Sequence, residues 1–254
     1  MVLVIAHRGF SGKYPENTLL AIKKAVELGV DFIEIDVWLS LDYQVFVIHD
    51  NKLSRTTTGR GAITMKITDQ IRKYHVKRGG HKIPLLEEVF PLIKKRTRLN
   101  IEIKNIWAAK PVAELIKKHK MQDKVMVSSG SILALQIIKK EIPLIKTAYV
   151  FYVSNNTRWG YFVTFIAKLS APLTHFYVSM VAKSAKVDYV HLSYPFSTKK
   201  FIKKLHKKGF KVNVWTVNTK ALMKKLIKNK ADGIITNRPD VLKRIVKETK
   251  IISS

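Results

Sequence analysis

The sequence contains no cysteine among its 254 residues. Disulfide bonds and thiolate metal sites are therefore excluded, and any metal ion must be bound by oxygen or nitrogen ligands. Acidic residues are also scarce, because 18 Asp and Glu are outnumbered by 47 Lys and Arg, which gives a formal net charge of +29. A charge of this size attracts polyanions such as nucleic acids, anionic lipid surfaces or phosphorylated small molecules.

The basic residues do not form a tail, and aromatic residues do not alternate with them. They are spread along expected helices such as Lys199–Lys208 and Lys220–Lys230. Platforms that stack nucleic-acid bases need interleaved aromatic rings, so we expect no nucleic-acid partner. A lysine-rich solvated surface is the simplest interpretation, and an anionic membrane surface is the alternative.

The chain also lacks a long uninterrupted apolar run. Its most apolar stretch, Trp159–Val181, contains Lys168, Pro172 and His175, and it falls short of the ~20 apolar residues that a transmembrane helix needs. We expect one or two well-buried helices there, with a membrane or dimer contact as the alternative. The apolar run Met1–Ala6 is too short for a signal peptide, so the sequence predicts a cytoplasmic protein, with membrane association left open.

Short apolar strands alternate with amphipathic helices along the whole chain. We expect strands at Val2–Ala6, Phe32–Val37, Leu99–Lys104, Val125–Ser128, Ile145–Val150, Tyr189–Leu192, Lys211–Val217 and Gly233–Thr236. We expect helices at Thr18–Leu28, Pro84–Lys95, Pro111–Lys118, Ile132–Lys140, in the apolar region up to Ala185, and at Thr198–Lys208, Lys220–Asn229 and Val241–Lys247. Eight strands, each followed by a helix, predict an α/β fold, a (β/α)₈ TIM barrel formed by residues 1–254 as one domain.

The first expected helix has recognisable ends, with Asn17 as a suitable N-cap and Gly29 as a suitable C′ residue. The segment Val45–Ile48 does not fit the parallel alternation, because only about seven residues separate it from the second strand, whereas a parallel crossover needs about a dozen. We expect an antiparallel hairpin arm that turns near Ser40–Tyr43 and brings His49 back over the barrel mouth. After it, residues 51–82 form a small insertion over the mouth, with a short helix at Ile67–Tyr74.

Polar residues follow the strands of the first half of the chain at the point where each strand ends. They are His7, Arg8 and Gly9, then Glu34 and Asp36, then His49 and Asp50, and finally Glu102 and Lys104. Residues two apart in a strand point to the same side, so Glu34 and Asp36 project together, as do Glu102 and Lys104. Active sites of TIM barrels lie at this end of the strands, so we expect these side chains to form one site.

The three carboxylates of Glu34, Asp36 and Glu102 would repel one another if they were unpaired. A divalent cation removes this conflict, and an all-oxygen site suits Mg²⁺ or Ca²⁺, with Mn²⁺ as a third option. The alternative is that one or more of these acids pairs with Arg8 or Lys104.

The remaining residues suit the chemistry of a phosphate ester. Two imidazoles, His7 and His49, can act as acid and base near neutral pH. Arg8 supplies a forked donor for phosphate oxygens, and Lys104 supplies a point charge. Gly9 permits a positive φ angle or a close approach of the backbone. Together they predict metal-assisted hydrolysis of a phosphate ester.

The order of these motifs resembles that of the glycerophosphodiester phosphodiesterase family. The matching segments are AHRG at 6–9, PENT at 15–18, EIDV at 34–37, VIHD at 47–50, IPLLEE at 83–88, IEIK at 101–104, VWTVN at 214–218 and DGIITNRP at 232–239. The resemblance implies a TIM barrel, a divalent metal ion and cleavage of glycerophosphodiesters to glycerol 3-phosphate and an alcohol.

The resemblance also implies roles for individual residues. By position, His7 and His49 match the family's acid–base pair, Glu34, Asp36 and Glu102 match its metal ligands, and Arg8, Lys104 and Trp215 match its phosphate- and substrate-binding residues. Trp215 would line the site beside the glycerol, unless it is an ordinary core aromatic. Glu16 matches the acid of the PENT motif, and the alternative is a residue that interacts with the helix dipole.

Two segments depart from the family pattern, namely the apolar stretch 150–186 and the VSSG sequence at 127–130. Both bear on the outer substrate pocket, so the head group of the substrate stays open. A second hypothesis is therefore a phospholipase D-like enzyme that hydrolyses lysophospholipids at a membrane surface. A third is a non-catalytic basic barrel, whose binding of polyanions would weaken steeply with salt. The nucleophile is either water or the glycerol 2-hydroxyl group.

Overall fold

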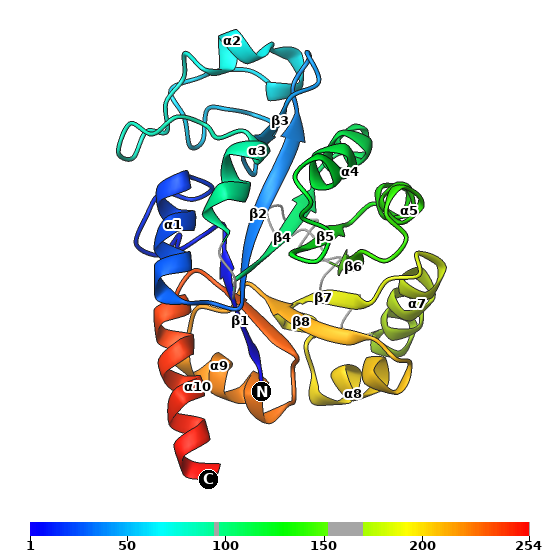
Figure 1. Ribbon diagram of the computed structural model, residues 1–254. Helices are drawn as coiled ribbons and strands as arrows, with labels where there is room; N and C mark the ends of the chain where they lie inside the picture. Colours follow the sequence, from blue (N-terminus) through cyan, green and yellow to red (C-terminus); the bar gives the residue numbers. More distant parts are fainter. Residues whose placement is uncertain (94–96, 152–169, 254) are drawn as a thin grey trace.

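The computed structural model describes residues 1–93, 97–151 and 170–253. The strands within these ranges form one sheet in the order β1-β9-β8-β7-β6-β5-β4-β2-β3, and an additional pairing of β1 with β2 closes it. Every pairing is parallel except that of β2 with β3. Eight strands therefore form a closed parallel barrel with helices around it, as Figure 1 shows, and the predicted TIM barrel is confirmed.

The strands are β1 (Leu3–His7), β2 (Phe32–Leu39), β3 (Val45–Val47), β4 (Arg98–Ile103), β5 (Val125–Ser129), β6 (Lys146–Phe151), β7 (Tyr189–Ser193), β8 (Lys211–Trp215) and β9 (Gly233–Thr236). The α-helices are α1 (Leu19–Leu28), α2 (Thr68–Ile71), α3 (Leu86–Val89), α4 (Ala109–Lys118), α5 (Ile132–Glu141), α7 (Ala171–Ser184), α8 (Lys199–Lys207), α9 (Lys220–Lys228) and α10 (Pro239–Ser253). Short 3₁₀ helices are η1 (Ile63–Met65), η2 (Phe90–Leu92), η3 (Ile106–Ala108) and η4 (Tyr194–Phe196).

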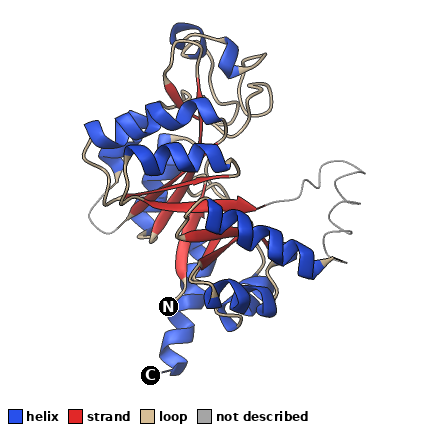
Figure 2. Cartoon of the chain, turned by 90° about the vertical axis from the view of Figure 1, so that its right-hand side faces the viewer, coloured by secondary structure: helices blue, strands red, loops and turns tan. Residues whose placement is uncertain are grey.

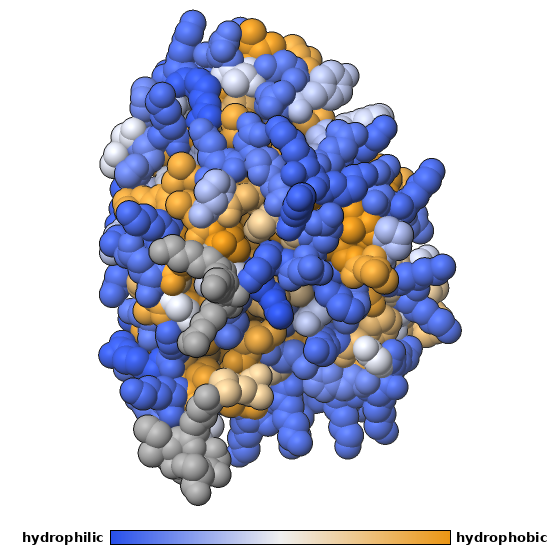
Figure 3. Space-filling model, viewed as in Figure 1, coloured by the Kyte–Doolittle hydropathy of each residue, from blue (hydrophilic) through white to orange (hydrophobic). Residues whose placement is uncertain are grey.

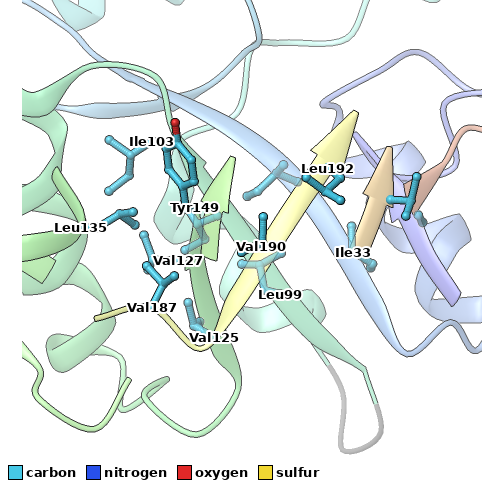
Figure 4. Packing of buried hydrophobic residues seen from close by; sticks show 14 of the residues in the cluster. Ile33, Leu99, Ile103, Val125, Val127, Leu135, Tyr149, Val187, Val190 and Leu192 are labelled. Atoms are coloured by element: carbon cyan, nitrogen blue, oxygen red, sulfur yellow. The ribbon is translucent and has the colours of Figure 1, made fainter. Parts of the chain in front are cut away.

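The core lies between the barrel strands and the surrounding helices. Figure 4 shows β-branched and leucine side chains of several strands packed against one another, among them Val127, Val190 and Leu192. A separate apolar cluster fills the barrel interior, formed by Ile5, Phe32, Met126, Ala148 and Ile235. Full burial of an aliphatic side chain stabilises the fold by ~1.5–3 kcal/mol. The side view in Figure 2 shows the strands enclosed by helices.

Helix α1 shows one correction to the expected caps. Its N-cap is Thr18, whose hydroxyl accepts a hydrogen bond from the amide of Ala21 at 3.1 Å. Asn17 lies one position earlier with a φ of 56°, and its side-chain amide instead bonds to Asp36 at 2.9 Å. The prediction of Asn17 as the cap is therefore wrong, because its amide faces the barrel mouth. The C-terminal prediction is confirmed, since Gly29 has a φ of 71°.

The hairpin arm is confirmed. Strand β3 pairs antiparallel with β2 with Val37 opposite Val47, and the turn between them includes Tyr43 at a φ of 61°. Residues of the insertion pack on this arm around a small core of their own, formed by Phe46, Ile48, Leu53, Ile63, Ile71 and Ile83. The helix of the insertion, α2, is shorter than the predicted Ile67–Tyr74. Figure 1 shows the insertion on one side of the barrel.

Two further expectations need correction. The predicted helix Pro84–Lys95 is divided into α3 and η2, because Pro91 has no amide hydrogen and cannot continue the α-helical ladder; residues 94 and 95 lie outside the described part. Of the apolar stretch Trp159–Val181, residues 159–169 also lie outside it. Helix α7 is not wholly buried, since Leu173, Phe176, Tyr177 and Met180 are exposed. No helix in the described part of the chain combines the length and apolar content needed to cross a bilayer.

Candidate active site

A cavity of about 1270 Å³ opens at the carboxyl ends of the barrel strands. Its wall includes eight of the side chains that the sequence singled out, namely His7, Arg8, Glu34, Asp36, His49, Glu102, Lys104 and Trp215. The parallel register explains this convergence, because it places the ends of β1, β2, β4 and β8 at the same rim. The volume is ample for a small phosphodiester.

Three carboxylates meet at the base of this cavity. Glu34 and Asp36 project from β2, and Glu102 projects from β4, where its Cα is paired with that of Asp36. Each acid offers an oxygen atom within 4.8 Å of the other two. Glu34 and Asp36 are buried, whereas Glu102 is partly exposed. The predicted gathering of the three acids is thus present in the structure.

Two of these acids have basic partners. Asp36 is 2.8 Å from the Lys104 ammonium and 3.2 Å from the Nε atom of Arg8, and Lys104 also bonds to Glu102. Burial opposes ionisation of Asp36, but the charges of Lys104 and Arg8 outweigh it and hold the pKa of Asp36 well below its usual value. Ion pairs of the kind weighed as the alternative are therefore present at Asp36 and Glu102, and the prediction that these acids also bind a metal stays untested.

Glu34 differs from the other two acids. Its Oε2 atom accepts a hydrogen bond from the amide of Arg8 at 2.9 Å, but its buried Oε1 atom has no hydrogen-bond partner among the residues that the structure describes. Burial, and then the charges of Asp36 and Glu102, raise the pKa of Glu34 well above its usual value. A divalent cation would satisfy this oxygen atom and offset the repulsion, so the donor set fits Mg²⁺, Ca²⁺ or Mn²⁺.

His7 is fixed by a bond from the far end of the chain. Its Nδ1–H donates to the side-chain oxygen of Asn237 at 2.6 Å, which leaves Nε2 as the acceptor nitrogen, 3.9 Å from Glu34. The Ser11 hydroxyl lies 2.6 Å from the backbone oxygen of His7 and 3.0 Å from the same Asn237 oxygen, so it packs beside this contact. Burial and the charge of Arg8 lower the pKa of His7 to about 3.

His49 follows the hairpin arm and interacts with a carboxylate. Its Nδ1–H donates to Asp50 at 2.5 Å, and its backbone oxygen accepts a bond from the indole of Trp38 at 2.8 Å. The arm thus brings His49 to the same cavity as His7, as its antiparallel geometry predicted.

The loop after β1 has the backbone conformation that Gly9 permits. Arg8 and Gly9 have φ angles of 54° and 76°. A Cβ atom on Gly9 would lie 2.7 Å from the carbonyl carbon of Ala21. Both predictions for Gly9, the positive φ and the close approach, are confirmed, and they fix the path on which Arg8 reaches the cavity.

A chain of ion pairs links the insertion to both sides of the cavity. Arg8 donates to Glu16 at 2.9 Å, Glu16 accepts from Arg55 at 2.7 Å, and Arg55 also bonds to Asp50, the partner of His49. Glu16 is thus paired with two guanidinium groups instead of lying within the first turn of α1. Sequence reasoning missed Arg55, because nothing in the spacing of the insertion indicates it.

Trp215 ends β8 on the cavity wall, where its indole N–H donates to the backbone oxygen of His191 at 3.2 Å. His191 is buried and accepts a bond from the amide of Asn213 at 3.0 Å. Sequence reasoning also missed Asn17 and Asn237, although each lies within a motif that carries the family resemblance.

Comparisons with known proteins agree with this geometry. Residues 7–241 match the Glycerophosphoryl diester phosphodiesterase family. A glycerophosphodiester phosphodiesterase of Caldanaerobacter subterraneus subsp. tengcongensis is 34% identical over 97% of this chain and 98% of its own. A phosphodiesterase of Oleispira antarctica, solved in complex with the product sn-glycerol-3-phosphate, superposes with a TM-score of 0.82 at 26% identity, covering 96% of each chain. A glycerophosphodiester phosphodiesterase of Thermotoga maritima has a TM-score of 0.74 at 28% identity, covering 96% of this chain and 98% of its own.

The barrel, the cavity at its carboxyl end and these similarities define a phosphoric diester hydrolase of the TIM-barrel class. The chain belongs to the glycerophosphoryl diester phosphodiesterase family.

Proposed function

We propose that this protein hydrolyses glycerophosphodiesters to glycerol 3-phosphate and an alcohol with the help of one divalent cation. The observation that supports this most strongly is the acid cluster of Glu34, Asp36 and Glu102 beside two histidines, in which one buried carboxylate oxygen lacks a partner among the described residues. These three acids would hold the cation. When bound, it would supply positive charge against the negative charge that develops on the phosphate.

Arg8 and Lys104 would hold the phosphate from the same side of the cavity. Both are mostly buried, with 16% and 18% of their side chains exposed, so water screens their charges little. Asp36 fixes both of them by ion pairs. They are therefore positioned before the substrate arrives, which is what electrostatic stabilisation of a transition state requires.

The hydrogen bonds of the two histidines favour different proton roles. Because Nδ1 of His7 donates to Asn237, its Nε2 lone pair is free to accept a proton from the nucleophile, so His7 suits the general base. The ring of His49 is instead held by the carboxylate of Asp50, which accepts its Nδ1–H, so we assign His49 the general-acid role, protonation of the leaving alcohol.

The leaving group provides the test of these roles. We expect His49→Ala to reduce kcat for glycerophosphocholine by about 10²–10⁴-fold but to affect a p-nitrophenyl diester much less, since nitrophenolate leaves without a proton. His7→Ala should affect both substrates alike. Equal losses for both substrates in His49→Ala would contradict the assignment.

The metal requirement is tested separately, by assaying glycerophosphocholine hydrolysis in excess chelator and after addition of Mg²⁺, Ca²⁺ or Mn²⁺. We expect activity to disappear in chelator and to return with at least one of these ions. Full activity in chelator would contradict the proposal. Hydrolysis of lysophospholipids is a second candidate, and the exposed apolar side chains of α7 next to the cavity favour it.

A further inference from the structure

Six exposed apolar side chains in the described part of the chain gather at the carboxyl end of the barrel, whereas others, such as Leu144, lie elsewhere. Trp107 lies in η3 directly after β4, Leu133 lies in the first turn of α5 after β5, and Tyr194 lies in η4 after β7. Leu173, Phe176 and Tyr177 lie in the first two turns of α7, which precedes β7 and so begins at the same end. We call these six residues the apolar rim.

The exposure of the rim is large for side chains of this kind. Trp107 is 76% exposed, Leu173 is 70% exposed and Phe176 is 62% exposed. The spacing of 173, 176 and 177 places three of these side chains on one face of α7. By contrast, the face of the molecule in Figure 3 is covered mostly by hydrophilic side chains. An exposed apolar patch rimmed by polar residues marks an interaction site.

The rim is continuous with the cavity. Tyr177 is half exposed and also lines the cavity wall. The 3₁₀ helix η3, which carries Trp107, packs against α5, which carries Leu133. Barrel strands β4, β5, β6 and β7 are consecutive neighbours in the sheet, so their carboxyl ends form one arc of the mouth. A partner that covers this arc therefore meets the entrance to the candidate active site.

The charge beside the rim is positive. Lys110 is exposed in the first turn of α4, three residues after Trp107, and Lys199 and Lys200 are exposed in the first turn of α8, the helix that follows η4. Acidic residues are favoured in the first turn of a helix because of its dipole, yet the first turns of α4, α5, α7 and α8 contain none. The positive N-terminal ends of these four helix dipoles therefore add to the positive charge of the lysines, and no acidic residue in their first turns offsets it.

We propose that the apolar rim docks on the surface of a bilayer that contains anionic phospholipids. Tryptophan, tyrosine and phenylalanine insert at the level of the headgroups, while lysines bind the anionic lipids around them. With the mouth against the lipid, the cavity receives a phosphodiester from the surface layer, so the substrate is of the lysophospholipid class. The docking itself does not depend on the proposed function, whereas the substrate does.

Vesicle sedimentation tests the docking with the whole protein. The probes are vesicles of phosphatidylcholine alone and of phosphatidylcholine with phosphatidylglycerol at three to one. We expect binding to the mixed vesicles that is at least about tenfold tighter than to phosphatidylcholine, and that weakens with salt. A double variant, Trp107→Ser with Phe176→Ser, should bind the mixed vesicles at least about tenfold more weakly.

The matched control is Leu144→Ser, which removes a side chain that is 92% exposed in the loop between α5 and β6, at the opposite end of the barrel. It should bind as the unmodified protein does. No binding to mixed vesicles, or equal binding by the double variant, would overturn the proposal. The proposal would also be overturned if sedimentation velocity showed a dimer of the unmodified protein and a monomer of the double variant, because the rim would then join two copies of this chain.

The same variants separate this inference from the proposed function. Because Trp107 and Phe176 do not line the cavity, the double variant should hydrolyse water-soluble glycerophosphocholine at the normal rate, but should lose activity on lysophosphatidylcholine presented in mixed vesicles. Loss of both activities in a folded double variant would overturn the inference. Normal docking without any hydrolysis of either substrate would overturn only the proposed function.

Discussion

Replacement of Glu34 by glutamine should stabilise the metal-free protein while it removes the response to metal. The buried Oε1 atom of Glu34 has no partner among the described residues, and burial and the charges of Asp36 and Glu102 disfavour a negative charge on it; an uncompensated buried group of this kind costs about 1–3 kcal/mol. An amide of the same shape keeps an oxygen for the Arg8 amide and reduces the charge that faces Asp36 and Glu102. For a chain of this length, a gain of about 1–3 kcal/mol in the free energy of unfolding corresponds to a rise in Tm of about 2–12 °C.

Glu102→Gln is the matched control, because it removes an acid of the same cluster that is ion-paired and partly exposed. It leaves Lys104 with Asp36 as its remaining acidic partner at 2.8 Å. In chelator we therefore expect the free energy of unfolding to fall by about 1 kcal/mol, whereas that of Glu34→Gln rises. The two variants therefore change the metal-free stability in opposite directions although both remove one ligand of the proposed cation.

The assay is thermal unfolding of the three proteins in chelator and in an excess of Mg²⁺, Ca²⁺ or Mn²⁺. An ion present at about a hundred times its Kd stabilises the unmodified protein by about 2.7 kcal/mol, and we expect most of this shift to vanish in both variants. A metal-induced shift of equal size in Glu34→Gln would refute the assignment of this carboxylate as a ligand. A lower Tm of Glu34→Gln in chelator would refute the argument from its unpartnered oxygen.

Three further outcomes follow from the hydrogen bonds and the backbone. Burial lowers the pKa of His191 to about 3, so as pH falls below ~6.5 only the unfolded state gains this proton and stability drops. Between pH 6.5 and 5.5 this lowers the free energy of unfolding by about 1 kcal/mol, and urea titrations of His191→Gln at these two pH values should show that much less loss. Gly9→Ala should destabilise the protein by more than about 1 kcal/mol in the same titration, since a Cβ there meets backbone at a φ of 76°; an unchanged midpoint would contradict the packing. Arg55→Gln should lower kcat by about tenfold with little change in Tm, because Asp50 and Glu16 each lose their ion pair with Arg55. Arg55→Lys should restore part of the rate, and a normal kcat in Arg55→Gln would show that these ion pairs have no catalytic effect.

The sequence predicted the barrel because its local signals agree with one another. The strand periods, the helix caps and the motif order all favour eight βα units, and the short spacing before Val45 identified the hairpin arm. The convergence of His7, Glu34 and Glu102 followed from the parallel topology alone, since the carboxyl ends of all barrel strands lie at one mouth.

The contacts that the sequence did not reveal join residues far apart in the chain. Asn237 bonds to His7 across 230 positions, and Arg55 bonds to Glu16 across 39 positions; neither has a local periodicity that marks it. Asn17 was misassigned for a related reason, because an N-cap and an amide that bonds to a distant carboxylate such as Asp36 look the same in sequence. Tertiary structure decides between them.

The location of His49 outside the barrel has a consequence for the native ensemble. His7 and the three acids come from strands with a neighbour on either side, whereas β3 is held by β2 on one side and by a single bridge to Leu85 on the other. Partial opening of this arm would cost less free energy than global unfolding, in the manner of a separate cooperative unit. Amide exchange should then report two protection levels, and His49, the proposed general acid, can leave the cavity while the barrel remains intact.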